Sequence, residues 1–537
     1  MSQDQIHNLS PTLKPRRMIR GEITYAVAKE QDANILHELG YREQKIKFFT
    51  YLYRSRELIE KLVARHLGLG SADACHVVDV EDWIHGSFNV CIRVDVTDPD
   101  GNLRRQVMIR FPLPYRIGED YCPGNADEKV RCEVGTYAWL QENCPAIPIP
   151  HLYGFGLSNR RSVCFLSPLS LIKIVRYLRT KFTYLESLPF FARNIQRLRR
   201  WLLQILRYPV PSLYIESHFE NRLGTPYIVI EYINQSRGKM LSESWEQGRS
   251  NPTLRTNLFH GLSRILLTLA RVPLPEIGSF IIDEDGYLRL NNRPLTLEIQ
   301  HLENQNIPVD IQRDSTYISV DSYIYDTLTL HESRLRYQPN AVHSFEDGFY
   351  QTSALMVMRS IWSCFFRREY FRGPFFLGLT DLNQTNIFVD DNWNIKCLID
   401  LEWACSQPVE MIHPPYWLTN EAIDLISLDK YESIHAEFME AFAEEEKCLN
   451  PPFLLYPVMK QGLEKGTFWC SLAMMSPTAL FKIFYDYIQP RFSKTHDDPA
   501  FWRITMPYWT FNTFAFIEHK VNEKERYDFS LREAFKS

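Results

Sequence analysis

Residues 379–403 read LTDLNQTNIFVDDNWNIKCLIDLEW, and the rest of the chain is interpreted from this stretch. It contains two short apolar runs, at 386–389 and 397–399. A polar segment rich in Asp and Asn, 390–394, lies between them. Short apolar runs joined by such a segment are typical of two strands and a tight turn, so the stretch predicts a β-hairpin.

Three polar residues flank this predicted hairpin. Asp381 precedes it, Asn386 begins it and Asp400 follows it. In phosphoryl transfer one carboxylate orients or deprotonates the acceptor, while an amide oxygen and a second carboxylate hold Mg²⁺ against the nucleotide phosphates. The order of the three residues fits that chemistry. The alternative is an ordinary hairpin whose turn is rich in Asp and Asn.

The stretch resembles the catalytic core of the aminoglycoside phosphotransferase/choline kinase-like superfamily, the small-molecule branch of the protein kinase-like fold. That family reads His-Gly-Asp-x-x-x-x-Asn, then a hairpin, then Ile-Asp-Trp/Phe-Glu. The resemblance implies that Asp381 is the catalytic residue and that Asn386 and Asp400 are the metal ligands. It also implies Mg²⁺ as cofactor and ATP as phosphate donor.

The chain departs from the family pattern at three positions. Leu379 and Thr380 stand where the family has His and Gly, and Leu401 replaces the aromatic residue, with Trp403 two positions later. The missing His is a supporting group and not the base, so we interpret its loss as a change in loop packing. The same departure leaves a second hypothesis open, a pseudokinase-like nucleotide-binding or scaffold protein with little turnover.

The composition is that of an ordinary globular protein. The chain has 537 residues, of which 45% are hydrophobic, 23% charged and 13% aromatic. This length suits roughly two to four domains, or one bilobal enzyme with insertions. A formal net charge of −5 argues against a dedicated nucleic-acid binder, so no nucleic-acid partner is expected.

The cysteines and the N-terminal residues indicate the cellular compartment of the protein. The 11 cysteines are scattered and show no C-x-x-C spacing, which favours reduced thiols over disulfides or a zinc site. The first residues lack the apolar segment of a signal peptide. We therefore expect a cytoplasmic protein.

Three regions are expected along the chain. Residues 1–74 form an N-terminal helical extension with a helix over 32–66; residues 75–234 form a small antiparallel-sheet N-lobe; residues 235–537 form a larger, mainly helical C-lobe. The whole is predicted to be an α+β, bilobal protein kinase-like fold.

Strands are expected over 75–80, 83–94 and 106–111, followed by a helix over 126–140. The segment 86–89 resembles the family loop that covers the nucleotide phosphates, although taken without its context a plain hairpin is the favoured explanation. The nucleotide-binding residues that the resemblance implies here are Gly86, Ser87, Phe88 and Asn89.

A cation and a helical glutamate follow this loop in the chain. Arg110 lies on the strand where the family has its phosphate-contacting Lys or Arg, and Glu133 matches the helical glutamate that pairs with it. Glu128 is the near alternative, and a solvated helix face would show the same residue types. Such an ion pair would hold the cation ready for the phosphates.

The segment 226–234 is an apolar strand that ends in Glu-Tyr-Ile. It resembles the family's Met-Glu-Tyr-Ile segment, whose backbone holds the adenine edge. The resemblance therefore implies that Glu231 and Ile233 bind the nucleotide.

A basic insertion at about 157–220 has no counterpart in the family pattern. Between residues 160 and 207 there are eleven basic residues and one acidic one, Glu186. Apolar residues recur at helical spacing, which predicts two amphipathic helices joined around Pro189. Docking of their apolar faces on the N-lobe is the favoured interpretation; an anionic substrate or membrane surface is the next, and nucleic acid the least favoured.

Together these patterns predict an ATP-dependent phosphotransferase that moves the γ-phosphate to a hydroxyl or amine of a small molecule. The acceptor partner is a small molecule whose identity no sequence feature indicates.

Overall fold

The computed structural model describes residues 13–69, 75–158, 161–164, 174–177, 181–216, 223–493 and 499–536. Its fold is mixed α+β, as the sequence predicts at that level, and its largest sheet is antiparallel. The strand order is β11-β10-β7-β12-β6-β5-β3, with β4 paired to β5. The eight strands are β3 (Cys75–Val77), β4 (Ile84–His85), β5 (Asn89–Thr97), β6 (Leu103–Pro112), β7 (Leu152–Gly156), β10 (Lys181–Tyr184), β11 (Tyr214–Glu216) and β12 (Tyr227–Glu231).

The β5–β6 hairpin is the longest strand pair of this sheet, and it confirms the strands predicted there. The two strands are joined by a turn in which the Asp98 carboxylate accepts hydrogen bonds from the backbone N–H groups of Asp100 and Asn102, at 3.0 and 2.9 Å. Alternate residues of β5, from Val90 to Val96, are buried on one face. Period-two burial is the pattern of a strand with one face in the core, and the residues of β5 that point to the other face are only half-buried.

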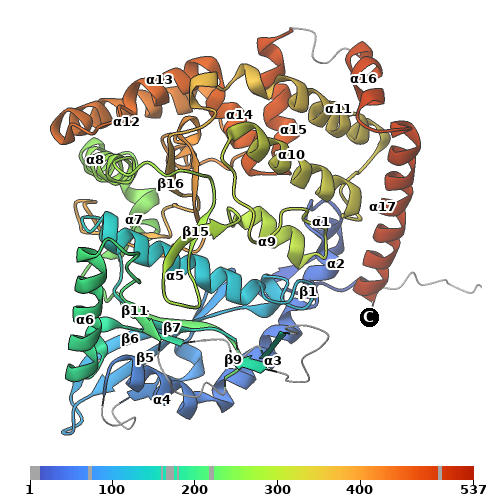
Figure 1. The fold of residues 1–537 in the computed structure, drawn as a ribbon. Helices are drawn as coiled ribbons and strands as arrows, with labels where there is room; N and C mark the ends of the chain where they lie inside the picture. The colour runs from blue at the N-terminus through green and yellow to red at the C-terminus, as the bar shows by residue number, and fades with distance from the viewer. Residues whose placement is uncertain are drawn as a thin grey trace, which may run out of the picture.

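Each face of the sheet is covered by a helix (Figure 1). Helix α4 (Arg56–His66) packs with α3 (Tyr41–Arg54) on the face that carries Val90, while α5 (Asn125–Asn143) lies across the other face. Helix α5 also packs tightly on the hairpin of residues 279–292. A Cβ at Gly135 would lie 2.2 Å from the carbonyl oxygen of Phe280. That contact requires glycine and brings α5 close to the second half of the chain.

Helices dominate the second half, with three small sheets among them in the described residues (Figure 1). The strands are β13 (Lys239–Met240), β14 (Ser279–Ile282), β15 (Leu288–Asn292), β16 (Phe375–Leu379), β17 (Ile387–Val389), β18 (Ile395–Leu398) and β19 (Ala404–Pro408). The helices are α7 (Leu241–Gly248), α8 (Pro252–Leu269), α9 (Leu297–Asn304), α10 (Val320–Tyr337), α11 (Phe345–Ile361), α12 (Leu428–Leu449), α13 (Tyr456–Lys465), α14 (Thr467–Met475), α15 (Leu480–Ile483), α16 (Pro499–Thr505) and α17 (Thr513–Lys536).

The N-terminal segment is helical, but the single helix predicted over 32–66 is wrong. It is divided into α2 (Ile35–Glu38), α3 and α4, which follow the short α1 (Tyr25–Lys29) and the strand pair β1 (Arg16–Arg17) and β2 (Glu22–Ile23). The breaks fall at Gly40 and Ser55, two residue types with weak helix propensity. Residues 1–12 and Gly70 lie outside the described residues.

The basic insertion differs from its prediction in two ways. Residues Ile174–Tyr177 form strand β9, paired with β8 (Arg161–Cys164), so the first predicted amphipathic helix is wrong. Ile174, Val175 and Tyr177 are β-branched or aromatic, and such residues favour strands when an apolar run is short. Other basic residues of the insertion, Arg160, Lys173 and Arg179, lie outside the described residues.

The second predicted helix of the insertion is present as α6 (Phe190–Ile205). It buries none of its side chains, so the expectation that its apolar face docks on the sheet is wrong. Among the described residues, no helix is both long enough and apolar enough to span a bilayer. Ten cysteines in the described part of the chain are free thiols.

Candidate functional site

The loop between β16 and β17 carries two of the three predicted site residues. The backbone carbonyl of Asp381 accepts hydrogen bonds from the side-chain amides of Asn386, at 2.8 Å, and Asn383, at 3.0 Å. The backbone N–H of Asn386 donates to the carbonyl of Asn383 at 3.0 Å. Asn side chains that bond to nearby backbone stabilise such tight turns. The spacing of five residues therefore brings Asp381 and Asn386 into direct contact.

The predicted hairpin is confirmed and brings Asp400 to the same place. Its turn is closed by Asp390, whose carboxylate accepts from the backbone N–H groups of Asn392 and Asn394 at 3.0 and 2.9 Å. At the other end, the backbone N–H of Ile399 donates to the carbonyl of Asn386 at 2.9 Å. Asp400 follows at once with φ of 61°, a left-handed conformation that Asp and Asn tolerate better than most residues.

Arg110 on β6 connects the sheet to this loop region. Its guanidinium donates to Glu133 on α5 at 2.8 Å, to Asp400 at 2.7 Å and to Glu402 at 3.2 Å. The predicted Arg110–Glu133 pair is thus present, whereas Glu128 pairs with Arg293 instead. A planar guanidinium has five donors in fixed directions and can serve several carboxylates at once.

Lys129 is a second buried cation that the sequence reading missed. Its ammonium contacts the Glu402 carboxylate and donates to the side-chain carbonyl of Asn89 at 2.7 Å. The amide nitrogen of Asn89 donates to Glu402 at 2.6 Å. Lys129 precedes Glu133 by one helical turn, so a search for charged residues on one face of α5 would have found it. Two cations therefore face three carboxylates at this point.

The electrostatic environment of the carboxylates differs from one to the next. Burial, and then the charge of Asp400, raise the pKa of Asp381 to about 6. Burial and the Asp400 charge also raise the pKa of Glu402 to about 8. Burial would raise the pKa of Asp400 as well, but the charges of Arg110 and Lys129 outweigh it and hold this pKa below its usual range. Asp400 is thus the carboxylate that most favours the ionised form.

The predicted phosphate-binding loop lies against the same cluster. Gly86 and Ser87 are exposed, and the carbonyl of Ser87 accepts from Arg116 at 2.9 Å. Phe88 is buried and packs edge-to-face on Trp403, with ring centroids 5.2 Å apart. Asn89 is buried, and both ends of its amide are engaged. The loop is therefore held down by Phe88, and the exposed part is its glycine and serine.

The two remaining predicted residues lie at the end of β12, next to β6. Ile228 of β12 is the strand partner of Arg110 on β6, so β12 lies directly beside the strand that carries this site residue. The backbone N–H of Glu231 donates to the carbonyl of His151 at 2.8 Å, and its carboxylate pairs with Arg237 at 2.6 Å. Ile233 is half-buried in the connection that follows.

Leu379 and Thr380, the two residues before Asp381, have structural partners. Leu379 ends β16 opposite Ala404, and the Thr380 hydroxyl donates to the carbonyl of Trp403 at 2.6 Å. The indole N–H of Trp417 donates to the carbonyl of Leu382, also at 2.6 Å. These bonds lie on both sides of Asp381, so the loop keeps its position without a histidine.

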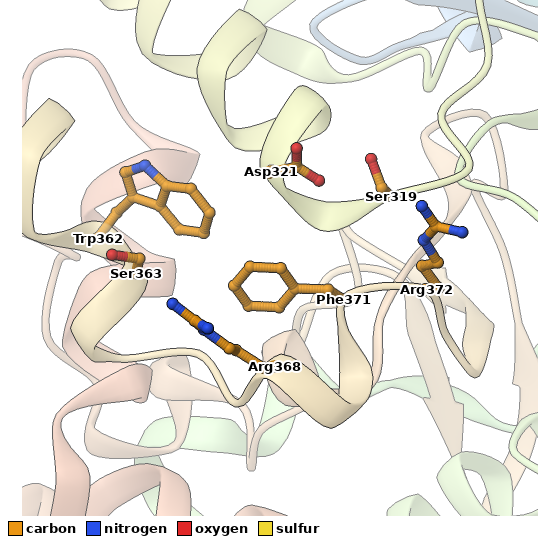
Figure 2. A pocket seen from close by; sticks show the side chains of 7 residues that line it. All are labelled: Ser319, Asp321, Trp362, Ser363, Arg368, Phe371 and Arg372. Carbon is orange, nitrogen blue, oxygen red and sulfur yellow. The ribbon is translucent and has the colours of Figure 1, made fainter.

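The cavity at these loops is small. It is lined by residues 379–382 and by others between 399 and 404, and its volume is about 10 Å³, room for about one water molecule. A much larger cavity of about 420 Å³ lies elsewhere, between the start of α10 and the short 3₁₀ helices η5 (Trp362–Cys364) and η6 (Arg368–Tyr370). Figure 2 shows Trp362, Phe371 and Arg368 around it. It shares no residue with the predicted site.

Two residues at the loops offer oxygen donors for a divalent cation. No cluster of three His, Cys, Asp or Glu side chains suited to a metal occurs in the described part of the chain. Asn386 and Asp400 supply one amide oxygen and one carboxylate, which are hard oxygen donors. Mg²⁺ commonly takes one or two protein carboxylates and completes its shell with water and substrate phosphates. The pair therefore fits Mg²⁺ together with a phosphate ligand.

Comparisons with known proteins identify no family for this chain: no family model matches it, and no curated protein matches it.

Proposed function

We propose that this chain is an ATP-dependent phosphotransferase that acts on a small molecule. The observation that carries the proposal is the chain of ion pairs from Glu133 through Arg110 to Asp400, with Asp381 and Asn386 beside it. A strand cation paired with a helical glutamate, next to a carboxylate that would hold Mg²⁺, supports the proposal because protein kinases use such a pair in phosphoryl transfer. Its parts come from three separate regions of the chain.

The proposal extends to the family and to the overall arrangement. It makes the chain similar to the aminoglycoside phosphotransferases and choline kinases, with a bilobal, protein kinase-like fold. Residues 75–234 would be the nucleotide-covering lobe and residues 235–537 the larger lobe. The nucleotide would lie between Gly86 and Ser87 on one side and Asp400 on the other, with its adenine edge at Glu231 and Ile233.

Each site residue then has a role. Asp381 orients the acceptor hydroxyl or amine and takes its proton. The acceptor atom forms a bond to the γ-phosphorus while the bond from that phosphorus to the β–γ bridging oxygen breaks. Asn386 and Asp400 would hold Mg²⁺, which neutralises phosphate charge when it is bound. Arg110, held by Glu133, contacts the phosphates.

A second candidate function is supported by the tightness of the site. The cavity at the loops measures about 10 Å³, and Phe88 and Asn89 are engaged in the interior. A nucleotide therefore requires the loop and its partners to move apart. A protein that binds a nucleotide or a partner without turnover would keep the same ion pairs and lack phosphate transfer.

The Asp381→Asn variant tests the proposed reaction. Asn keeps the size of the side chain and removes the base, so transfer should fall at least a hundredfold while nucleotide affinity stays within about twofold. We would measure transfer from ATP across a library of small hydroxyl and amino compounds, and affinity by thermal shift with ATP and Mg²⁺. Asp391→Asn, at the exposed hairpin turn, is the matched control and should behave like the parent.

Three results distinguish the candidates. Transfer by the parent that Asp381→Asn abolishes supports the phosphotransferase. Nucleotide binding by the parent without transfer to any compound supports the second candidate. Near-normal transfer by the Asp381→Asn protein would contradict the assignment of the catalytic residue.

A further inference from the structure

Helix α6 presents an apolar face to solvent. Phe191, Ile195, Leu198, Leu202 and Ile205 recur every three or four residues, so they lie on one side of the helix. Phe191 is 80% exposed, Ile195 64% and Leu198 56%. Exposed apolar side chains are common singly, but a continuous apolar face of this length marks an interaction site.

The apolar face continues at both ends of the helix with aromatic residues. Phe190 at the first turn, Trp201 in the last half and Tyr208 just beyond are all more than half exposed, at 64%, 56% and 63%. In Figure 1 the helix lies at the left edge of the molecule. The exposed fractions of its apolar side chains show that this face meets solvent.

The opposite side of the helix is basic and is turned toward the protein. Arg193 and Arg197 lie near the Glu186 carboxylate, and Arg197 contacts it directly. Arg200 lies 3.9 Å from Glu142 of α5. Arg200 thus connects the helix to α5, while Arg193 and Arg197 pair with the turn just before the helix. A surface helix usually buries its apolar stripe, and α6 does the reverse.

Cations also border the apolar face. Arg199 is adjacent to Leu198 and Leu202 on its edge and is exposed, and Arg207 is exposed just after the helix. Within the described part of the chain, neither has a carboxylate at salt-bridge distance. Residues 181–216 carry a net charge of +4, while the whole chain carries −5. Of these cations, Arg199 and Arg207 are the two that border the exposed apolar face.

Helices of this kind bind the surface of anionic membranes. A strongly amphipathic helix with Phe, Trp and Leu on one face and arginines along its borders lies in the plane of the headgroups, with its apolar face among the acyl chains. Trp and Tyr favour that interfacial position. A second copy of the chain is a poorer occupant, because antiparallel or parallel contact of two such faces would bring like charges together.

We propose that α6 is an in-plane membrane anchor that binds the surface of a bilayer rich in anionic lipid. Its 16 residues would occupy about 24 Å of the interface. The proposal is independent of the phosphotransferase assignment, because no residue of α6 belongs to the proposed site.

The test is co-sedimentation of the full chain with vesicles at low and high salt. We would compare phosphatidylcholine vesicles with vesicles that contain about one-third phosphatidylserine. The parent should bind the anionic vesicles and bind phosphatidylcholine alone at least tenfold more weakly. Its binding should decrease as salt screens the contact. Absence of binding to anionic vesicles at low salt would overturn the proposal.

Two variants locate the contact on α6. Replacing Phe191 and Leu198 by Gln should weaken binding at least tenfold, because both side chains lose the apolar transfer that anchors them. Replacing Arg199 and Arg207 by Gln should weaken it roughly thirtyfold, since each juxtamembrane cation contributes about a fivefold factor. All four side chains are exposed, so these proteins should fold like the parent.

Matched controls carry the same changes elsewhere. Phe511 and Phe529 are exposed apolar residues outside α6, and Arg368 and Arg372 are exposed cations outside it. Their Gln variants should bind vesicles like the parent. Equal losses in the control and α6 variants would overturn the assignment to α6. A parent dimer that the Phe191/Leu198 change makes monomeric, without vesicle binding in either protein, would assign the face to self-association instead.

Discussion

Arg110 is the residue on which the geometry of the site depends most. Its side chain is 7% exposed and meets carboxylates from α5 and from the segment after β18. The charges of Glu133 and Asp400 outweigh burial and hold the pKa of Arg110 well above its usual range. A buried cation that lost these partners would be left uncompensated, at a cost of about 3–5 kcal/mol. The ion pairs therefore fix where Asp400 lies.

Asp400→Asn should remove Mg²⁺-dependent binding of nucleotide. Asn tolerates the left-handed backbone at this position and can still accept from Arg110, so the fold should persist, whereas Ala there would add strain. The cation would lose its charged protein ligand. The apparent affinity for ATP in the presence of Mg²⁺ should therefore fall at least tenfold. Thermal shift with ATP at several Mg²⁺ concentrations is the measurement. Unchanged Mg²⁺ dependence would contradict the role of Asp400.

At the scale of elements, the contact between α4 and the sheet contains a buried histidine. His66 is fully buried, and its ring nitrogens lie 3.0 Å from the hydroxyls of Thr183 on β10 and Tyr227 on β12. Burial, and then the charge of Lys181, lower the pKa of His66 to about 3. The folded protein therefore keeps this imidazole neutral at pH values where the unfolded chain protonates it.

The pH dependence of stability follows from this difference. In the unfolded chain the pKa of His66 is about 6.5, and below that pH the unfolded state binds a proton that the folded state does not bind. The stability therefore falls as the pH decreases toward 3. Between pH 7.5 and 5.0 the His66 contribution should amount to about 2 kcal/mol. His66→Gln should be less stable than the parent at pH 7.5. When the pH is lowered from 7.5 to 5.0, however, the free energy of unfolding of the variant should decrease by about 2 kcal/mol less than that of the parent.

Calorimetry at the two pH values checks this prediction. The exposed His76 is the control for the substitution itself, and His76→Gln should leave the stability at pH 7.5 unchanged. An equal decrease for the parent and the His66→Gln protein would show that His66 is protonated in the fold.

At the scale of the molecule, the two ends of the described chain pack together. Helix α17 runs along the right side in Figure 1 and meets α1 and α2 at its lower end. Leu531 and Phe535 form a separate apolar cluster with Ala28 and Ile35. The Tyr527 hydroxyl accepts from the backbone N–H of Ile35 at 2.9 Å. This cluster is distinct from the two that cover the faces of the main sheet.

Leu531→Ala should therefore loosen both ends and leave the main sheet intact. Removal of a buried Leu side chain costs about 2–5 kcal/mol where the surroundings cannot close the cavity. Hydrogen exchange should increase over residues 13–39 and 513–536 and stay unchanged over 89–112. The exposed Phe529→Ala is the control. Faster exchange throughout the chain would mean that the terminal cluster is not an independent unit.

The sequence by itself determined the parts of the site that are close in the chain. The hairpin of 387–398 and the contact of Asp381 with Asn386 follow from apolar alternation and from Asn and Asp side chains that bond to their own backbone. The β5–β6 hairpin and helix α5 were predictable for the same reason, since local spacing shows which residues share a face. The predicted first helix of the basic insertion is wrong because three of the four residues of Ile174–Tyr177 are β-branched or aromatic, which favours a strand.

Only the tertiary structure decided which of these faces meet. Lys129 and Glu402 are 273 positions apart, and no local pattern relates one to the other. The same holds for Phe88 on Trp403, which closes the site. The amphipathic spacing of α6 was plain in the sequence, yet the direction of its apolar face was not. Spacing shows that a face is apolar, but what covers that face depends on long-range packing. In α6 the side that contacts α5 is the basic one, through Arg200, and the apolar side is exposed.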